Sequence, residues 1–251
     1  MRRAALATAM LAMPALGGCG EDDDAERPEL VVFAASSLTT AFDEYGAEFE
    51  GAEVRLSFGG SDELAAQIRQ GVAPDVYAAA NATPLDELAA EGLLERPETF
   101  ATNELVVGVP AGSDIDELAD LGRPGMTVAI GDPEVPVGAY TREVLDALGS
   151  RPSGAILGNV ATEEPDVGGI VAKVNQGAVD AGFVYRSDVA ASGGEIEEVE
   201  IPASASPDVA YGIAISTDAA QPELAREFVD GAIDGAGREI LLDRGFDPAP
   251  E

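Results

Sequence analysis

Residues 30–40, with the sequence LVVFAASSLTT, constrain the fold more than any other stretch of the chain. The stretch begins with a short apolar run rich in β-branched side chains, which is typical of a strand buried on both faces. From Leu38 onward, apolar residues recur every three or four positions, as they do on one face of a helix. Ser36 and Ser37 therefore stand where a buried strand turns into a helix. Free N–H groups and the positive end of the helix dipole favour an anion at such a place, although a serine there is also an ordinary helix N-cap.

The same order of strand, small-residue turn and helix start recurs along the chain. It predicts helix starts at Ser61, which is either an N-cap or an anion donor, at the end of the proline-rich loop 131–138, and at Asp166 and Val167. In α/β folds with alternating strands and helices, ligands lie outside the carboxyl ends of the strands, next to helix N-termini. Because the junctions come from both halves of the chain, we expect a two-lobed α/β fold with mixed sheets, flanking helices and a ligand cleft between the lobes.

The lobe boundaries are predicted from two apolar strands, at 103–110 and 209–216. We take the chain to cross between the lobes within these strands. Lobe 1 is then expected to comprise residues 29–106 and 210–251, and lobe 2 residues 107–209. A helix is also predicted at 113–121, after a Gly-Ser turn.

The N-terminus has the pattern of a targeting segment. Two arginines precede an apolar stretch that is too short to span a bilayer, and the sequence Leu-Gly-Gly-Cys that ends at Cys19 resembles a bacterial lipobox. We therefore expect a lipoprotein signal peptide at 1–18, lipid on Cys19, and an acidic tether at 19–28. The expected location is extracytoplasmic, with a lipid anchor in the cell membrane.

Composition excludes several classes of function. Histidine is absent from the sequence and Cys19 is the only cysteine, which leaves no imidazole for a metal site or catalytic triad and no pair for a disulfide. The formal net charge of −33 argues against nucleic-acid binding. Ser36 and Ser37 lack a neighbouring base that could activate them as nucleophiles, so we expect the protein not to be an enzyme.

Five segments together resemble the molybdate-binding proteins of bacterial ABC transporters. They are VFAASSLT, SFGGSDELAAQI, PDVYAAAN, GDPEVPVGAY and AGFVYRSDV, and they follow one another in the order found in that family. The resemblance implies the periplasmic-binding-protein type II fold, with a tetrahedral oxyanion held between the lobes by neutral donors. It assigns oxyanion binding to five residues: Ser37, Ser61, Val137, Val167 and Tyr185. The serines and the tyrosine would donate from their hydroxyls, and the valines from their backbone amides.

Two features of this sequence bear on that assignment. The proline-rich loop is one residue shorter than in some relatives, so Gly138 is the alternative to Val137. Asp62 directly follows Ser61, and we expect its carboxylate to point away from the cleft because it would repel a dianion.

Neutral N–H and O–H donors suit a fully deprotonated dianion and disfavour phosphate, which carries a proton near neutral pH. The sequence leaves molybdate and tungstate undistinguished, and sulfate or another small oxyanion stays an alternative. The resemblance implies a monomer without a cofactor, in which molybdenum or tungsten is held only as the oxyanion. Its implied partners are a membrane permease and a cytoplasmic ATPase. A sensor lipoprotein without a transport role is the other alternative.

Overall fold

The computed structural model describes residues 27–250. Cys19 and the predicted signal peptide lie outside this range, as does most of the predicted tether. Arg27 and Pro28, the last two residues of the predicted tether, are exposed and hydrogen-bonded to the first lobe. Arg27 donates hydrogen bonds to the backbone carbonyls of Phe49, Glu50 and Ala52, and the carbonyl of Pro28 accepts from the amide of Glu53.

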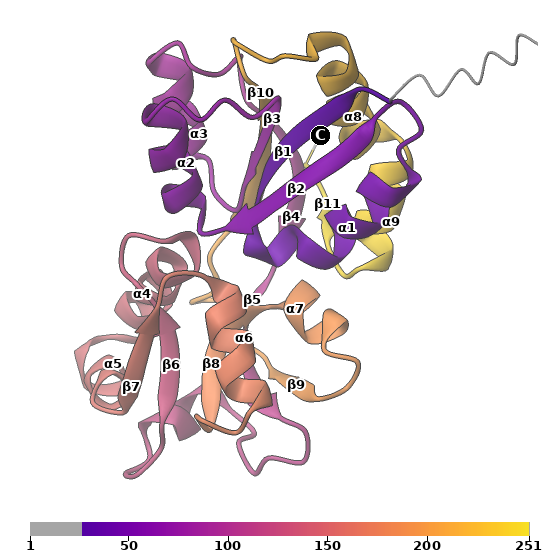
Figure 1. Ribbon diagram of the computed structural model, residues 1–251. Helices are drawn as coiled ribbons and strands as arrows, with labels where there is room; N and C mark the ends of the chain where they lie inside the picture. The colour runs from indigo at the N-terminus through magenta and orange to yellow at the C-terminus, as the bar shows by residue number, and fades with distance from the viewer. Residues whose placement is uncertain (1–26, 251) are drawn as a thin grey trace, which may run out of the picture.

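Within the described residues the chain forms two lobes, each built on one sheet (Figure 1). The first sheet has the strand order β11-β4-β10-β3-β1-β2, and β10 runs antiparallel to both of its neighbours. Its strands are β1 Glu29–Ala35, β2 Glu53–Gly59, β3 Val76–Ala79, β4 Glu98–Asn103, β10 Val209–Ile215 and β11 Asp247–Pro248. Its helices are η1 Ser36–Leu38, α1 Thr39–Glu48, α2 Ser61–Arg69, α3 Thr83–Ala90, α8 Pro222–Asp234 and α9 Ala236–Asp243.

The second sheet has the order β7-β6-β8-β5-β9, with β5 antiparallel to β8 and β9. Its strands are β5 Leu105–Pro110, β6 Val128–Gly131, β7 Val160–Glu164, β8 Ala181–Tyr185 and β9 Ile196–Val199. Its helices are η2 Leu118–Gly122, α4 Pro136–Leu148, α5 Ser150–Leu157, α6 Val167–Asn175 and α7 Arg186–Ala191. The predicted helix at 113–121 is wrong, because only a 3-10 helix, η2, forms there.

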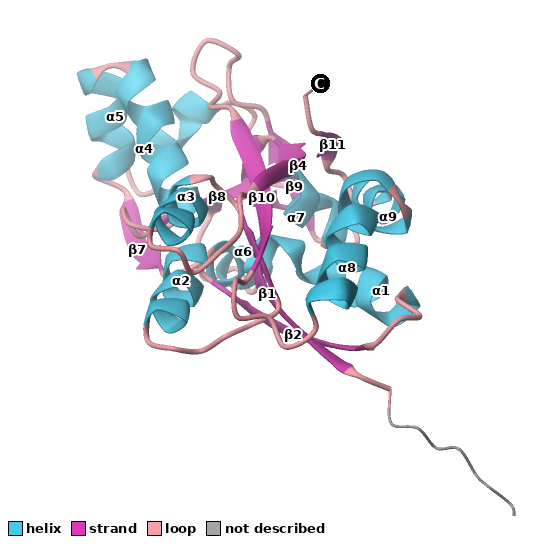
Figure 2. Cartoon of the chain, turned by 90° about the horizontal axis from the view of Figure 1, so that it is seen from above, coloured by secondary structure: helices cyan, strands magenta, loops and turns pink. Residues whose placement is uncertain are grey.

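Helices cover both faces of the first sheet. Figure 2 shows α2 and α3 on one face and α1, α8 and α9 on the other. The central strand β1 is buried on both faces: Phe33 packs toward the α2 and α3 side, and Val32 belongs to the core that also contains Phe42 of α1. The apolar run of β1 therefore has the double-sided burial that its sequence predicts.

The chain crosses between the lobes outside the strands rather than within them. Val106 pairs with Val184 in the second sheet, and Val209 pairs with Asn103 in the first sheet. Both valines therefore lie in the lobe opposite to the one predicted. The first crossing is at Glu104, whose backbone amide donates to Asn103 Oδ1 at 2.9 Å and so ends β4 next to the start of β5. None of the helices formed by residues 27–250 has both the length and the apolar character required to span a bilayer.

Candidate oxyanion site

A small cavity lies between the lobes, at the carboxyl ends of strands from both sheets. Its empty volume is about 230 Å³, including the open solvent at its mouth. The residues that line it come from both lobes: Ala35, Ser36, Ser37, Gly59, Gly60, Ser61, Ala80, Val135, Pro136, Val137, Asp166, Val167 and Tyr185. All five residues predicted to bind the oxyanion are in this set, so the structure brings them together around one space.

The lobes approach each other closely at this cavity. A Cβ built on Gly60, in the first lobe, would lie 2.6 Å from the carbonyl oxygen of Pro165 in the second lobe and 3.8 Å from Val135 Cγ1. A Cβ atom does not approach a carbonyl oxygen this closely, so only glycine at this position permits the observed approach. The cavity is therefore that of a closed arrangement of the lobes.

Ser37 lies in the 3-10 turn that joins β1 to α1. The N-cap of this turn is Ala35, which has no side-chain oxygen, and neither serine caps the helix through its hydroxyl. The reading of Ser36 or Ser37 as a plain N-cap is thus wrong. The Ser37 side chain is buried, and its Oγ lies 2.8 Å from the hydroxyl of Tyr211.

Ser61 is the first residue of α2, and Gly60 is the N-cap. Ser61 therefore does not cap its own helix. Its Oγ instead accepts a hydrogen bond from the amide of Ala80, at 3.2 Å. The backbone carbonyl of Ser61 accepts from the hydroxyl of Tyr77 at 2.6 Å, which fixes the turn to β3. The hydroxyl proton of Ser61 has no acceptor among residues 27–250, so it is available to a ligand.

Val137 and Val167 line the cavity from the second lobe. Each lies in the first turn of a helix, α4 and α6, where N–H groups have no partner within the helix. Val135, the N-cap of α4, has no side chain that could cap it, whereas Asp166 caps α6 by accepting from the amide of Gly169 at 3.0 Å.

Gly138, the alternative to Val137, is absent from the residues that line the cavity. It has a packing role instead. A Cβ on Gly138 would lie 1.8 Å from the carbonyl oxygen of Asp132, so the short proline-rich loop closes against its backbone. Val137 lines the cavity and Gly138 does not, and the assignment of the donor amide to Val137 stays a prediction.

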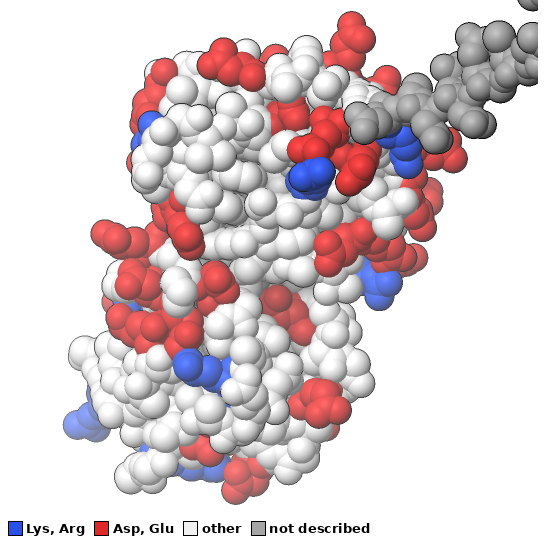
Figure 3. Space-filling model, in the orientation of Figure 1, with Lys and Arg blue, Asp and Glu red and all other residues white. Residues whose placement is uncertain are grey.

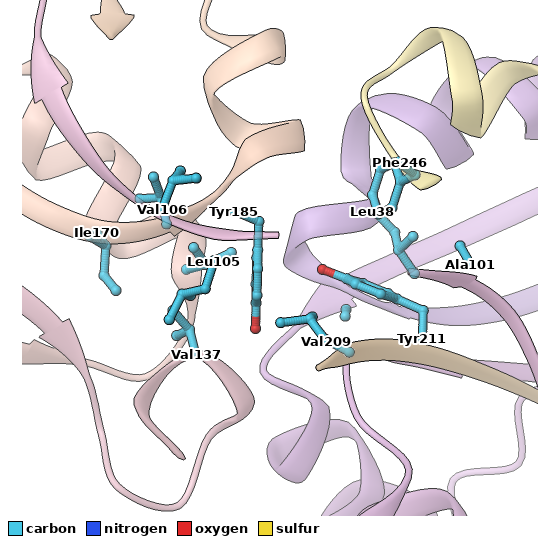
Figure 4. Close-up of a cluster of buried hydrophobic side chains, with 14 of the residues drawn as sticks. Leu38, Ala101, Leu105, Val106, Val137, Ile170, Tyr185, Val209, Tyr211 and Phe246 are labelled. Carbon is cyan, nitrogen blue, oxygen red and sulfur yellow. The ribbon is translucent and has the colours of Figure 1, made fainter. Parts of the chain in front are cut away.

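Tyr185 ends β8 with its side chain between the lobes (Figure 4). The side chain is 1% exposed, and its hydroxyl has no hydrogen-bond partner among residues 27–250. A buried hydroxyl without a partner is costly, by about 1–3 kcal/mol. Burial raises the pKa of Tyr185 well above its ordinary value, so the group stays neutral and keeps a proton to donate.

Electrostatics at the cavity come from dipoles and carboxylates. The set that lines the cavity contains Asp166 and neither lysine nor arginine. Asp62 is outside that set, which agrees with the expectation that it faces away from the ligand. Its Oδ2 is nevertheless buried without a partner among the described residues, and burial, followed by the charges of Glu87 and Glu134, raises its pKa.

Among the charged side chains on the visible face, acidic ones are more widespread than basic ones, including in the region where the lobes meet (Figure 3). In the part of the chain that the structure describes, no group of three or more carboxylate, histidine or cysteine side chains could hold a metal ion. Attraction for an anion must therefore come from the local helix N-termini and hydroxyls.

Two neighbours of the predicted site residues were missed from the sequence. Tyr211 contacts Ser37 from β10, and the amide of Ala80 contacts Ser61 from the end of β3. Tyr211 sits within the apolar run of a buried strand, so nothing in the local pattern separates it from a core residue. Only the pairing of β10 with β3 brings it to the site.

Comparison with known proteins gives a consistent result. The sequence model of the family described as bacterial extracellular solute-binding protein matches residues 30–247. The molybdate-binding protein ModA of Mycobacterium tuberculosis is 39% identical over 256 residues, which cover 96% of this chain and 95% of that protein. ModA of Escherichia coli is 30% identical over 204 residues, which cover 76% and 78%.

Solved structures share the fold. The periplasmic molybdate-binding protein of Azotobacter vinelandii has a TM-score of 0.79 at 22% identity, covering 88% of this chain and 100% of that one. The sulfate-binding protein SubI of Mycobacterium tuberculosis has a TM-score of 0.76 at 16% identity, covering 88% and 87%. The predicted two-lobed fold is confirmed, and the fold alone does not separate molybdate binders from sulfate binders.

Proposed function

The chain belongs to the bacterial extracellular solute-binding protein family, as the sequence resemblance predicted, and we propose that it captures molybdate or tungstate for an ABC importer. Two relatives with substantial identity, from Mycobacterium tuberculosis and Escherichia coli, are named as molybdate-binding proteins. In this proposal the oxyanion occupies the cavity between the lobes. Ser37, Ser61 and Tyr185 donate from hydroxyls, and Val137 and Val167 donate from amides.

One observation carries the proposal. Helices from both lobes point their N-termini at the same small cavity, and three of these N-termini have no side-chain cap, because their N-cap residues are Ala35, Gly60 and Val135. N–H groups that elsewhere would be capped by serine or aspartate are left for a ligand. Each dipole contributes about 0.3–1 kcal/mol, and each hydrogen bond to a charged group about 1.5–3 kcal/mol.

The donors also favour one protonation state of the ligand. Ser61 Oγ already accepts from Ala80, and the Tyr185 hydroxyl has a proton without a protein acceptor in the described chain. These hydroxyls thus offer protons, whereas hydrogen phosphate needs an acceptor for its own proton. The carboxylate that lines the cavity, Asp166, already accepts from the amide of Gly169 through Oδ1. A fully deprotonated dianion, such as molybdate, tungstate or sulfate, satisfies every donor.

Sulfate is the second candidate, because a sulfate-binding protein has the same fold. Sulfate is smaller than molybdate, and a cavity sized for molybdate would leave some donors out of reach of sulfate oxygens. Titration calorimetry of the chain from Gly20 onward, with molybdate, tungstate and sulfate in turn, tests the proposal. Tight one-to-one binding of the first two with weak sulfate binding supports it. Tight sulfate binding moves the function to sulfate capture, and no heat with any of the three refutes oxyanion binding.

The rest of the proposal follows from this role. The protein acts outside the cytoplasm as a monomer, anchored by lipid on Cys19, and passes its ligand to a membrane permease driven by a cytoplasmic ATPase. It performs no catalysis and needs no cofactor. A variant Cys19→Ser that is released from the membrane fraction would support the anchor, and one that stays bound would contradict it.

A further inference from the structure

Ser37 has a neighbour that determines how its hydroxyl can be used. The Oγ of Ser37 lies 2.8 Å from the hydroxyl of Tyr211, and both side chains are buried. A serine hydroxyl can donate one hydrogen bond and accept others. If Ser37 Oγ accepts a hydrogen bond from the Tyr211 hydroxyl, the Ser37 hydroxyl can donate its own hydrogen bond to whatever occupies the cavity.

The surroundings of Tyr211 set the direction of this hydrogen bond. Among residues 27–250 the hydrogen-bond partner of the Tyr211 hydroxyl is Ser37 Oγ. The side chain of Asn103, at the end of β4, has other partners. Its Oδ1 already accepts from the amide of Glu104 at 2.9 Å, and its Nδ2 donates to Ser187 Oγ at 2.8 Å. A phenol proton needs an acceptor when it is buried, and Ser37 Oγ is the acceptor that the described chain offers, so the Tyr211 hydroxyl donates and Ser37 Oγ accepts.

The Tyr211 ring is held so that its hydroxyl has little freedom to move. The side chain is fully buried, and Phe246 and Phe100 pack against it edge-on, with ring centroids 5.2 Å and 6.4 Å away. Tyr185 of the other lobe also packs edge-on, at 6.0 Å, and Figure 4 shows the two tyrosines facing each other across the interface. Burial raises the pKa of Tyr211 well above its ordinary value, so the hydroxyl keeps the proton that it donates.

We propose that Tyr211 is a positioning residue of the oxyanion site. Its hydroxyl donates a hydrogen bond to Ser37 Oγ and so orients the Ser37 hydroxyl to donate its own hydrogen bond to the ligand. The amide of Ala80 does the same for Ser61. This inference rests on the proposed function, and it adds a source of selectivity. Without Tyr211, the Ser37 hydroxyl is free to rotate and its oxygen gains a second open acceptor position, so Ser37 discriminates less against a protonated oxyanion.

Tyr211→Phe tests the proposal, because it removes the hydroxyl and keeps the ring. Titration calorimetry near neutral pH would measure the dissociation constants of molybdate and of arsenate, which carries at least one proton under these conditions. We expect molybdate binding to weaken about three- to tenfold, as for the loss of one neutral hydrogen bond. We expect arsenate binding to weaken less or to tighten, so that the preference for molybdate falls.

Two further variants separate positioning from a general loss of structure. Tyr45→Phe removes another buried tyrosine hydroxyl of the same lobe, which donates to the carbonyl of Phe228 at 2.9 Å, away from the cavity. It is expected to leave the preference unchanged. In a Ser37→Ala background, the effect of Tyr211→Phe on molybdate binding is expected to disappear, because Tyr211 acts through Ser37.

The outcomes are distinguishable. If the unaltered protein binds molybdate and Tyr211→Phe matches Tyr45→Phe in both affinity and preference, the positioning role is overturned while the proposed function stands. The same holds if Tyr211→Phe has its full effect in the Ser37→Ala background. If the unaltered protein binds neither oxyanion, the proposed function fails and the positioning role fails with it.

Discussion

Removal of the Tyr185 hydroxyl should weaken molybdate binding without lowering the stability of the ligand-free protein. The hydroxyl is buried without a hydrogen-bond partner among residues 27–250, and Tyr185 lines the cavity between the lobes. Tyr185→Phe removes a donor that the bound oxyanion would use. A hydrogen bond to a charged group contributes about 1.5–3 kcal/mol, so the dissociation constant for molybdate should rise roughly 10- to 140-fold.

The same substitution should cost the ligand-free protein nothing. No protein hydrogen bond is lost within the described chain, and an unsatisfied polar group leaves a buried position. Tyr45→Phe is the matched control, because the Tyr45 hydroxyl donates to the carbonyl of Phe228 at 2.9 Å. Loss of that bond should lower the unfolding free energy by about 1 kcal/mol, which corresponds to a fall in Tm of about 2–4 °C for a protein of this size.

Calorimetric titration with molybdate and thermal unfolding without ligand measure the two effects. The expected result is that Tyr185→Phe weakens binding and leaves Tm unchanged or higher, whereas Tyr45→Phe lowers Tm and leaves binding unchanged. The reasoning is refuted if Tyr185→Phe lowers Tm as much as Tyr45→Phe does while molybdate binding is unaffected. The hydroxyl would then have a structural partner and no ligand role.

Three further predictions concern closure and charge. Gly60→Ala places a Cβ 2.6 Å from the Pro165 carbonyl oxygen and should weaken molybdate binding at least tenfold by calorimetry. In the control Gly59→Ala, the added Cβ meets side-chain atoms no closer than 3.6 Å, and binding should be normal. Equal affinities of the two variants would contradict the closed arrangement of the lobes. Asp166→Asn keeps a capping oxygen for α6 but removes a negative charge from the cavity wall, so molybdate binding should tighten severalfold, and weaker binding with the helix intact by circular dichroism would oppose this. Burial raises the pKa of Asp188 from 3.8 to about 7. Between these pH values the folded state holds a proton that the unfolded chain releases. The free energy of unfolding therefore falls as pH rises from about 4 to about 7. Asp188→Asn should therefore gain stability relative to the unaltered protein over that range in denaturant titrations, and parallel pH profiles would argue against the raised pKa.

Much of the site could be predicted from the sequence because its residues are tied to local patterns. Ser37, Ser61 and Val167 each stand at a strand-to-helix junction, and the spacing of apolar residues marks such junctions directly. The family resemblance added a prediction of which atom of each residue would face the ligand. The five predicted site residues lie around one cavity because the carboxyl ends of parallel strands meet at the same edge of each sheet.

The remainder depended on contacts between distant segments. Tyr211 is separated from Ser37 by most of the chain, and only the position of β10 next to β3 brings them together. The crossing at Glu104 was misplaced because the break between β4 and β5 has no glycine or proline to mark it. The stretch 113–121 contains helix-favouring residues, yet most of it is irregular. The backbone amides of Asp116 and Glu117 donate to the carboxylate of Asp120, which satisfies these groups without a helix.

A structure with tungstate bound tests the central claim most directly, because tungsten can be located by its anomalous scattering. The account predicts one tungsten atom in the cavity between the lobes, with its oxygens within hydrogen-bond distance of the hydroxyls of Ser37, Ser61 and Tyr185 and of the amides of Val137 and Val167. Tungsten at any other position, or in the cavity without contact to these donors, would contradict it.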